Sequence, residues 1–278
     1  MQAQKAIGQR NHTIEMNLQK ITEEVIQITK DVGYFIRTEL QNFDRSFIEY
    51  KGKNDLVSYV DKKAEQSLIK ALREVLPEAG FVSEEDPQNH QLSDKEYHWV
   101  IDPLDGTTNF LHGLPVFAIS IALMQGKEIV AGVVFEINRS ECFYAWKDGG
   151  AYLDQAKIHV SRADSLSESL LATGFPYYNF EKMEQYLTIL NGFMQHTHGL
   201  RRFGSAAVDL AYVACGRFEG FFEYNLKPWD VAAGALLVQE AGGMVSTFNG
   251  GDDYIFGREI VASGLIHDEM LEVIGKHW

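Results

Sequence analysis

The stretch that decides the fold reads WVIDPLDGTTNF, residues 99–110. Residues 99–101 are typical of the end of a buried strand, Pro103 predicts that the strand stops, and Gly106 predicts a tight turn that opens a helix. A helix start offers unpaired N–H groups that suit a phosphate. Asp102 and Asp105 beside it are oxygen ligands that suit divalent cations. For either aspartate alone a helix cap is the simpler interpretation, but the whole stretch predicts a metal and phosphate site.

The composition limits the partners that the protein can have. The chain has 278 residues, 45% of them hydrophobic, and 39 acidic against 25 basic residues give a net charge of −14. This charge repels a nucleic-acid backbone or an anionic membrane, so we predict neither as a partner. An acidic protein that handles an anionic substrate must neutralise its site locally, and metal ions can do this.

Cellular location is predicted from what the sequence lacks. Cys142 and Cys215 lie singly in apolar runs and are predicted to be reduced core residues. No apolar stretch approaches the roughly 20 residues that cross a bilayer, and the start of the chain lacks the apolar block of a signal peptide. We therefore expect a cytoplasmic protein. Residues 1–15 are polar and without periodicity, which predicts a disordered extension before Met16.

The first half, residues 16–157, is predicted to be an α+β unit. Apolar residues recur every three or four positions from Leu18 to about Leu40, which indicates an amphipathic helix. A second helix is expected to start at Asp61. From Val116 the period changes to two, which predicts an antiparallel meander that closes at residues 148–150.

The second half, residues 158–278, is predicted to be an α/β unit. The chain turns polar at 158–165, after which strand-like and helix-like segments alternate. Strands are expected at 170–174, 199–203, 218–224 and 242–246, and helices at 181–194, 205–215 and 229–241. Such alternation is typical of a layered α/β arrangement.

Acidic residues stand at the ends of four predicted elements. They are Asp61, the pair Glu84 and Glu85, the pair Asp102 and Asp105, and Asp230. If they converge, they form a cage for two or three magnesium ions.

These motifs resemble the inositol monophosphatase family of magnesium-dependent, lithium-sensitive phosphatases. The resemblance is carried by SEE at 83–85, DPLDGTTNF at 102–110 and WDVAAG at 229–234, with supporting matches at 55–58, 61 and 204–207. It covers the chain from about Met16 to the C-terminus. It implies a layered αβαβα sandwich of the inositol monophosphatase and fructose-1,6-bisphosphatase type. The family also leads us to expect a homodimer.

The resemblance implies a set of metal ligands. One ion is held by Glu84, Asp102 and the backbone carbonyl of Leu104, and a second by Asp102, Asp105 and Asp230. A third, weaker ion is held through water near Glu84. The expected ions are Mg²⁺, and their side-chain ligands are the acidic residues of the motifs.

The resemblance also implies catalytic and substrate-binding residues. Glu84 orients the attacking water together with Thr107, which is paired with Asp61. The remaining substrate-binding residues are Asp105, Gly106, Thr108, Ser205, Ala206 and Glu223. A lysine approaches the site in this family, and the sequence leaves Lys51 and Lys53 as alternatives.

The implied reaction is hydrolysis of a small phosphate monoester by metal-activated water, without a covalent intermediate. The expected substrate is myo-inositol 1-phosphate, with fructose 1,6-bisphosphate and nucleotide 3′-phosphates as alternatives. Thr108 favours the first two, because a lysine commonly replaces it in the nucleotide branch. A non-catalytic metal-binding regulatory module is the alternative of another class.

Other site classes fit the spacing less well. In an EF-hand that starts at Asp102, the sixth position requires glycine and the twelfth an acid, but glycine comes fifth and the twelfth residue is Gly113. An aspartyl-phosphate enzyme would have one residue, not two, between Asp102 and Asp105. Ser205 lacks the first glycine of a nucleophile elbow. His196 and His198 lack a third zinc ligand, and Arg201 and Arg202 are expected at the surface.

Overall fold

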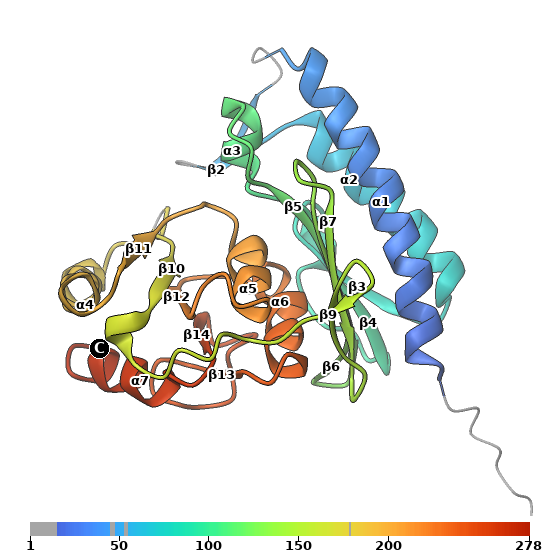
Figure 1. The fold of residues 1–278 in the computed structure, drawn as a ribbon. Helices are drawn as coiled ribbons and strands as arrows, with labels where there is room; N and C mark the ends of the chain where they lie inside the picture. Colours follow the sequence, from blue (N-terminus) through green and yellow to red (C-terminus); the bar gives the residue numbers. More distant parts are fainter. Residues whose placement is uncertain (1–15, 45–47, 53–54, 178) are drawn as a thin grey trace, which may run out of the picture.

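The computed structural model describes residues 16–44, 48–52, 55–177 and 179–278, with the backbone alone at 50–52, 55 and 56. The prediction for residues 1–15 lies outside the described residues. The described chain forms five layers (Figure 1). Helices α1 and α2 cover a seven-stranded sheet, α5 and α6 lie between it and a five-stranded sheet, and α4 and α7 cover the far face. The predicted αβαβα fold class is confirmed.

The helices are α1 (Leu18–Asn42), α2 (Tyr59–Val75), α3 (Thr107–His112), α4 (Met183–His196), α5 (Ala206–Ala214), α6 (Pro228–Glu240) and α7 (His267–Gly275). Two 3₁₀ turns are η2 (Pro87–Asn89) and η3 (Leu166–Glu168). The hairpin strands β1 (Glu49–Gly52) and β2 (Asp55–Val57) pair with each other.

The seven-stranded sheet runs in chain order through β3 (Gly80–Ser83), β4 (Tyr97–Asp105), β5 (Ala118–Gln125), β6 (Glu128–Glu136), β7 (Glu141–Trp146), β8 (Gly150–Leu153) and β9 (Ala156–Lys157). All neighbours are antiparallel except β3 and β4. The five-stranded sheet has the order β11 (Gly199–Arg201), β10 (Leu170–Thr173), β12 (Gly220–Tyr224), β14 (Glu259–Ser263) and β13 (Met244–Ser246). Its first three strands are parallel, and β14 is antiparallel to both neighbours.

The start of α2 differs from the prediction by two residues. The helix begins at Tyr59, and the Ser58 side chain accepts a hydrogen bond from the Val60 N–H at 3.1 Å. Asp61 is the third residue of the helix, and its carboxylate accepts a hydrogen bond from the Ser58 N–H, which completes a capping box. The acid is therefore fixed inside the first turn rather than placed at the cap.

The predicted stop at Pro103 is wrong, because β4 continues to Asp105. The register of β4 against β5 shifts between Asp102 and Asp105, so Pro103 and Leu104 lie in a bulge. A bulge tolerates proline because no ladder N–H is required there. The parallel neighbour β3 pairs only as far as Ile101, which leaves this end of β4 with one partner strand.

The predicted closure of the meander at residues 148–150 is also wrong. Gly150 starts β8 instead, and β9 follows as an additional strand. The short length of these two strands makes their alternation too weak to recognise. The elements β14 and α7 were not predicted, although the apolar residues 260–262 of β14 are buried.

The two sheets come from separate parts of the chain, on either side of the polar residues 158–165. Helices α5 and α6 belong to the second part, yet α6 packs on β5 and β6 of the first sheet. One buried apolar cluster accordingly contains residues of both parts. The division into two halves stays a prediction.

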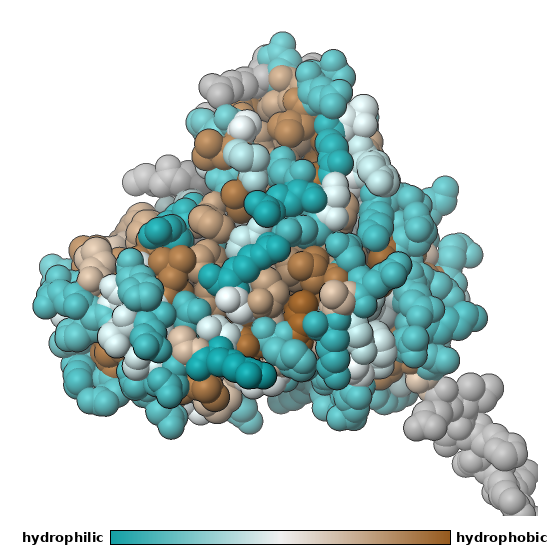
Figure 2. Space-filling model, viewed as in Figure 1, coloured by the Kyte–Doolittle hydropathy of each residue, from teal (hydrophilic) through white to brown (hydrophobic). Residues whose placement is uncertain are grey.

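The surface in the view of Figure 2 is hydrophilic over most of its area, with apolar side chains in separate patches. Within the described ranges, none of the helices is both long and apolar enough to cross a membrane.

Candidate functional site

Three aspartates from two distant segments meet at one end of the first sheet. Asp102 and Asp105 lie in the last part of β4, and Asp230 lies in the first turn of α6. One carboxylate oxygen from each lies within 4.8 Å of the others. Asp102 is the most deeply placed, with 2% of its surface exposed. The fold therefore brings together three of the predicted metal ligands.

Backbone donors fix one oxygen of Asp102 and one of Asp230. The Leu104 N–H donates to Asp102 Oδ1 at 2.9 Å, across the bulge of β4. The Lys227 N–H donates to Asp230 Oδ2 at 2.7 Å, at the start of α6. Each bond orients its carboxylate and leaves the second oxygen for another ligand.

Asp105 is held by the N-terminus of α5. Its Oδ2 accepts hydrogen bonds from the Ser205 hydroxyl and the Ala207 N–H, both at 2.7 Å. Ala206, between them, is the first residue of α5 and is buried. The partial positive charge of a helix start favours a carboxylate at this place. The contact joins β4 to the second part of the chain.

A second link sets Asp230 beside Asp102. Asp102 pairs with Ser120 of β5 in the sheet, and the Ser120 hydroxyl donates to the Trp229 carbonyl at 3.1 Å. Because Trp229 precedes Asp230, this bond holds the start of α6 against the sheet at the acidic cluster. The link was not predicted, since a lone serine in an apolar strand carries no sequence signal.

The acids repel one another. Burial, and then the charges of Glu84, Asp105 and Asp230, raise the pKa of Asp102 well above its usual range. Burial likewise raises the pKa of Asp105 to about 6 and that of Asp230 well above the usual value. Glu84 acts on all three, so it lies close to the cluster. Hard carboxylates crowded in this way fit divalent cations, which neutralise the repulsion.

These pKa shifts predict a pH-dependent effect of Mg²⁺ on stability. An acid with a raised pKa in the folded state keeps its proton there above the unfolded value of about 4, so without metal the melting temperature should fall as pH rises through about 6. Mg²⁺ binds the ionised form. We expect saturating Mg²⁺ to raise the melting temperature by roughly 5 °C at pH 8 and by much less at pH 5.5.

Differential scanning fluorimetry at both pH values, with EDTA as reference, measures this difference. An equal shift at the two pH values would contradict binding at the aspartate cluster. Ca²⁺ in place of Mg²⁺ shows whether the effect depends on the size of the ion.

Thr107 begins α3 beside the cluster. Its hydroxyl lies 2.9 Å from Asp61 Oδ1 and 3.0 Å from the Leu104 carbonyl oxygen. Asp61 is fully buried, and its Oδ2 accepts from the Ser58 N–H and hydroxyl at 2.9 and 2.7 Å. The structure therefore contains the predicted contact between Thr107 and Asp61. Thr108 follows in the same turn and is half-buried.

Gly106 allows α3 to start where it does. Its φ of 96° lies in the left-handed region, and an added Cβ would come within 3.0 Å of the Val116 carbonyl oxygen and 3.2 Å of that of Gly204. A side chain would therefore push these backbone segments apart. The Asn109 amide binds the same region, because Nδ2 donates to the Val116 and Phe203 carbonyls at 2.7 Å.

Glu223 lies on β12, at 8% exposure, against the backbone of Gly174. Burial raises its pKa to about 8, the Arg202 charge lowers it and the Asp105 charge raises it. The charge of Asp105 acts on Glu223, and the resemblance implies that both residues line the substrate pocket. Asp209 of α5 is 1% exposed, and burial followed by the charges of Glu223 and Asp105 raises its pKa well above the usual value.

Arg202 lies at the surface, as predicted, and also contacts other side chains. It is exposed, like Arg201, but its Nη2 donates to the Tyr177 hydroxyl at 2.7 Å. Its guanidinium also lies 5.9 Å from the ring centre of Phe175. The alternative between Lys51 and Lys53 falls on side chains outside the described part of the structure.

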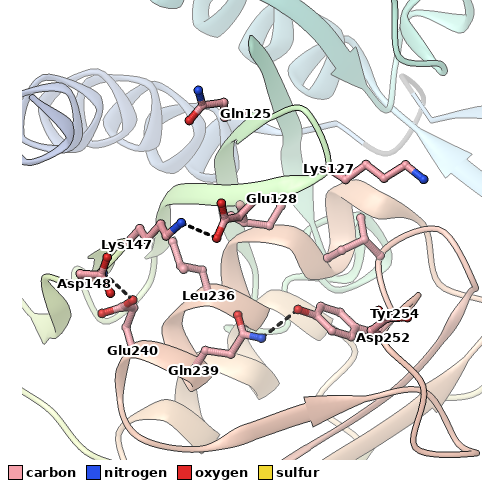
Figure 3. Close-up of a pocket in the computed structure, with 12 residues that line it drawn as sticks. Gln125, Lys127, Glu128, Lys147, Asp148, Leu236, Gln239, Glu240, Asp252 and Tyr254 are labelled. Atoms are coloured by element: carbon pink, nitrogen blue, oxygen red, sulfur yellow. Dashed lines mark hydrogen bonds and ion pairs between the residues drawn. The ribbon is translucent and has the colours of Figure 1, made fainter. Parts of the chain in front are cut away.

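A separate cavity of 540 Å³ lies at the other end of α6, between the turns 125–129 and 147–148 (Figure 3). Two contacts join residues that line it: Lys147 pairs with Glu128 at 2.6 Å, and the Asp148 backbone N–H donates to the Glu240 carboxylate at 2.9 Å. None of the predicted site residues lines it. The acidic cluster, and not this cavity, is the candidate for metal and phosphate.

The layered fold, with two mixed sheets and an acidic cluster at a sheet end, defines the class of inositol monophosphatase and fructose-bisphosphatase-like proteins. The chain belongs to the Inositol monophosphatase family, whose family model matches residues 17–278. The family resemblance seen in the sequence is confirmed.

Relatives and solved structures agree with this assignment. The chain is 44% identical to the Putative Nus factor SuhB of Neisseria meningitidis, over 85% of this chain and 90% of the relative. It is 39% identical to the Inositol-1-monophosphatase of Mesorhizobium japonicum, over 90% and 91%. The crystal structure of extragenic suppressor protein suhB from Bartonella henselae superposes with a TM-score of 0.86 at 38% identity, covering 93% of this chain and all of that one.

Proposed function

We propose that this protein is a magnesium-dependent phosphatase that hydrolyses myo-inositol 1-phosphate to inositol and phosphate. The observation that carries the proposal is the meeting of Asp102, Asp105 and Asp230 within 4.8 Å, next to Thr107 and its partner Asp61. A metal-binding module without catalysis has no need of the Thr107 and Asp61 pair. The relative in Mesorhizobium japonicum is named an inositol-1-monophosphatase, which supports the substrate.

The acids and one carbonyl would hold the ions. Glu84, Asp102 and the Leu104 carbonyl would hold the first ion. Asp102, Asp105 and Asp230 would hold the second ion. Glu84 would hold a third ion through water. Bound divalent ions supply charge neutralisation at the phosphate and lower the pKa of a bound water. The chain itself supplies no covalent nucleophile in this proposal.

Thr107 and Glu84 orient the attacking water. When the Thr107 hydroxyl donates a hydrogen bond to Asp61, the Thr107 hydroxyl oxygen still has lone pairs that can accept a hydrogen bond from water. Glu84 accepts the second hydrogen bond of the same water. Gly106 and Thr107 present backbone N–H groups to the phosphate at the start of α3.

The alcohol part of the substrate is bound by residues from both sheets and from the start of α5. Asp105 of β4, Ser205 and Ala206 at the start of α5, and Glu223 of β12 line this part of the site, and Thr108 is a further substrate-binding residue. Carboxylates and hydroxyls suit a polyol, because each hydroxyl of the substrate can donate to one of them.

Initial rates of phosphate release test the proposal. With Mg²⁺, we expect kcat/KM for myo-inositol 1-phosphate to exceed that for fructose 1,6-bisphosphate and for a nucleotide 3′-phosphate by at least roughly tenfold. EDTA should abolish all release. A higher kcat/KM for fructose 1,6-bisphosphate or the nucleotide 3′-phosphate would identify that compound as the substrate instead. No phosphate release from any of the three would favour a non-catalytic metal-binding module.

The relative in Neisseria meningitidis is named a Nus factor, not a phosphatase. For this chain the net charge of −14 is the observation that favours a small-molecule substrate over a nucleic acid. The absence of a nucleic-acid partner, the homodimer and the cytoplasmic location stay predictions.

A further inference from the structure

A second buried acid lies on α2, one helical turn after Asp61. Glu65 is 3% exposed and shares the inner face of α2 with Ala64 and Leu68. Its Oε2 accepts a hydrogen bond from the Glu85 N–H at 2.8 Å. A carboxylate buried on an apolar face is costly unless it is hydrogen-bonded, so its contact with Glu85 accounts for its position.

Glu85 directly follows Glu84 in the segment after β3. This segment also receives support from the other side, where His90 Nε2 lies 3.0 Å from the Glu84 carbonyl oxygen. The Glu84 backbone is thus held on both sides. The contact with Glu65 ties it to α2.

We propose that Glu65 is a positioning residue that sets the place of Glu84 relative to Thr107. Asp61 and Glu65 lie about 6 Å apart along α2, as one helical turn requires. Asp61 holds Thr107, and Glu65 holds the backbone next to Glu84. One rigid helix therefore fixes both residues that orient the attacking water. The inference rests on the proposed function.

Kinetics of Glu65 variants test the role. Glu65→Ala removes the acceptor and leaves the Glu85 N–H without its partner. We expect kcat to fall at least roughly tenfold, because a displacement of 1 Å at a reacting group can cost about 10²-fold. KM for myo-inositol 1-phosphate should change less than about threefold, since the substrate contacts remain. Glu65→Gln keeps an acceptor oxygen and should restore most of kcat.

Two variants of the same helix serve as controls. Glu74→Ala removes an exposed acid from α2, and Leu68→Val disturbs the packing of the inner face without removing a hydrogen bond. Both should keep the wild-type kcat, although Leu68→Val lowers the melting temperature. If Glu65→Ala alters only the melting temperature, or if Glu65→Gln loses as much kcat as Glu65→Ala, the positioning role is wrong.

Hydrogen exchange provides a readout that does not depend on activity. In Glu65→Ala, but not in Glu65→Gln or Glu74→Ala, a peptide covering residues 83–86 should exchange faster by mass spectrometry. Unchanged exchange there in Glu65→Ala would overturn the inference. A wild-type protein that hydrolyses no phosphomonoester, yet shows this exchange pattern, would overturn the proposed function and keep the anchoring of this segment by Glu65.

Discussion

Replacing Asp102 with asparagine should reduce magnesium-dependent phosphate release by at least about 10³-fold, because the proposed metal site, of which Asp102 is a ligand, would supply several kcal/mol of transition-state stabilisation. Asp102 is proposed to bind two ions, and the neutral amide cannot bridge them. The variant should fold, since the side-chain oxygen can still accept the Leu104 N–H. Phosphate release and the effect of Mg²⁺ on the melting temperature measure the two consequences.

Leu104→Val is the matched control in the same bulge. Leu104 is proposed to contribute only its carbonyl to the metal, and its buried side chain packs in the core beneath. We expect a loss of about 1 kcal/mol in the free energy of unfolding. Turnover should remain near that of the wild type. Near wild-type turnover in Asp102→Asn would reject the metal-bridging role.

The second large effect is expected from Thr107→Ala. Loss of the hydroxyl removes the group that is proposed to orient the water and leaves Asp61 Oδ1 without its donor. We expect kcat to fall roughly 10²- to 10³-fold, in the range of general-base effects. KM should change little, because the backbone N–H groups of Gly106 and Thr107 are retained. Single-turnover hydrolysis of myo-inositol 1-phosphate measures the chemical step.

Thr107→Ser restores the hydroxyl at the same place and should recover most of the activity. The serine can still donate to Asp61 or to the Leu104 carbonyl. If the alanine and serine variants are equally active, the hydroxyl does not orient the water. If both are equally inactive, the methyl group of threonine and its packing are what matter.

Motifs with local chemistry were predictable from the sequence. The helix start at Thr107 followed from Gly106, and the predicted start of a helix at Ser205 lies within one residue of the start of α5 at Ala206. The long helix α1 followed from its apolar period, and Val25 and Val32 of the predicted stripe are buried. These features depend on neighbouring residues alone, so one sequence is enough to predict them.

Features that depend on tertiary contacts were not predictable. Pro103 remains in β4 because the bulge requires no N–H from it, and only the pairing with β5 shows this. The hydroxyl of Ser120 matters because Trp229 lies opposite it. Glu65 did carry a signal, since it is a charged residue on the apolar stripe of α2, but the sequence does not show its contact with the Glu85 backbone.

The meeting of the acidic residues was predictable in part. Their positions at element ends predicted that they could meet, and the family resemblance predicted which would do so. The structure places Asp102, Asp105 and Asp230 together and brings Glu84 into their electrostatic range. The ligand roles and the catalytic roles stay predictions.

Anomalous diffraction from crystals soaked in Mn²⁺ tests the central claim most directly, because Mn²⁺ substitutes for Mg²⁺ at oxygen sites. The account predicts at least two anomalous peaks at the acidic cluster, with Asp102 bound to both ions and the Leu104 carbonyl bound to one. No peak at the cluster, or a single peak that Asp102 does not contact, would contradict it.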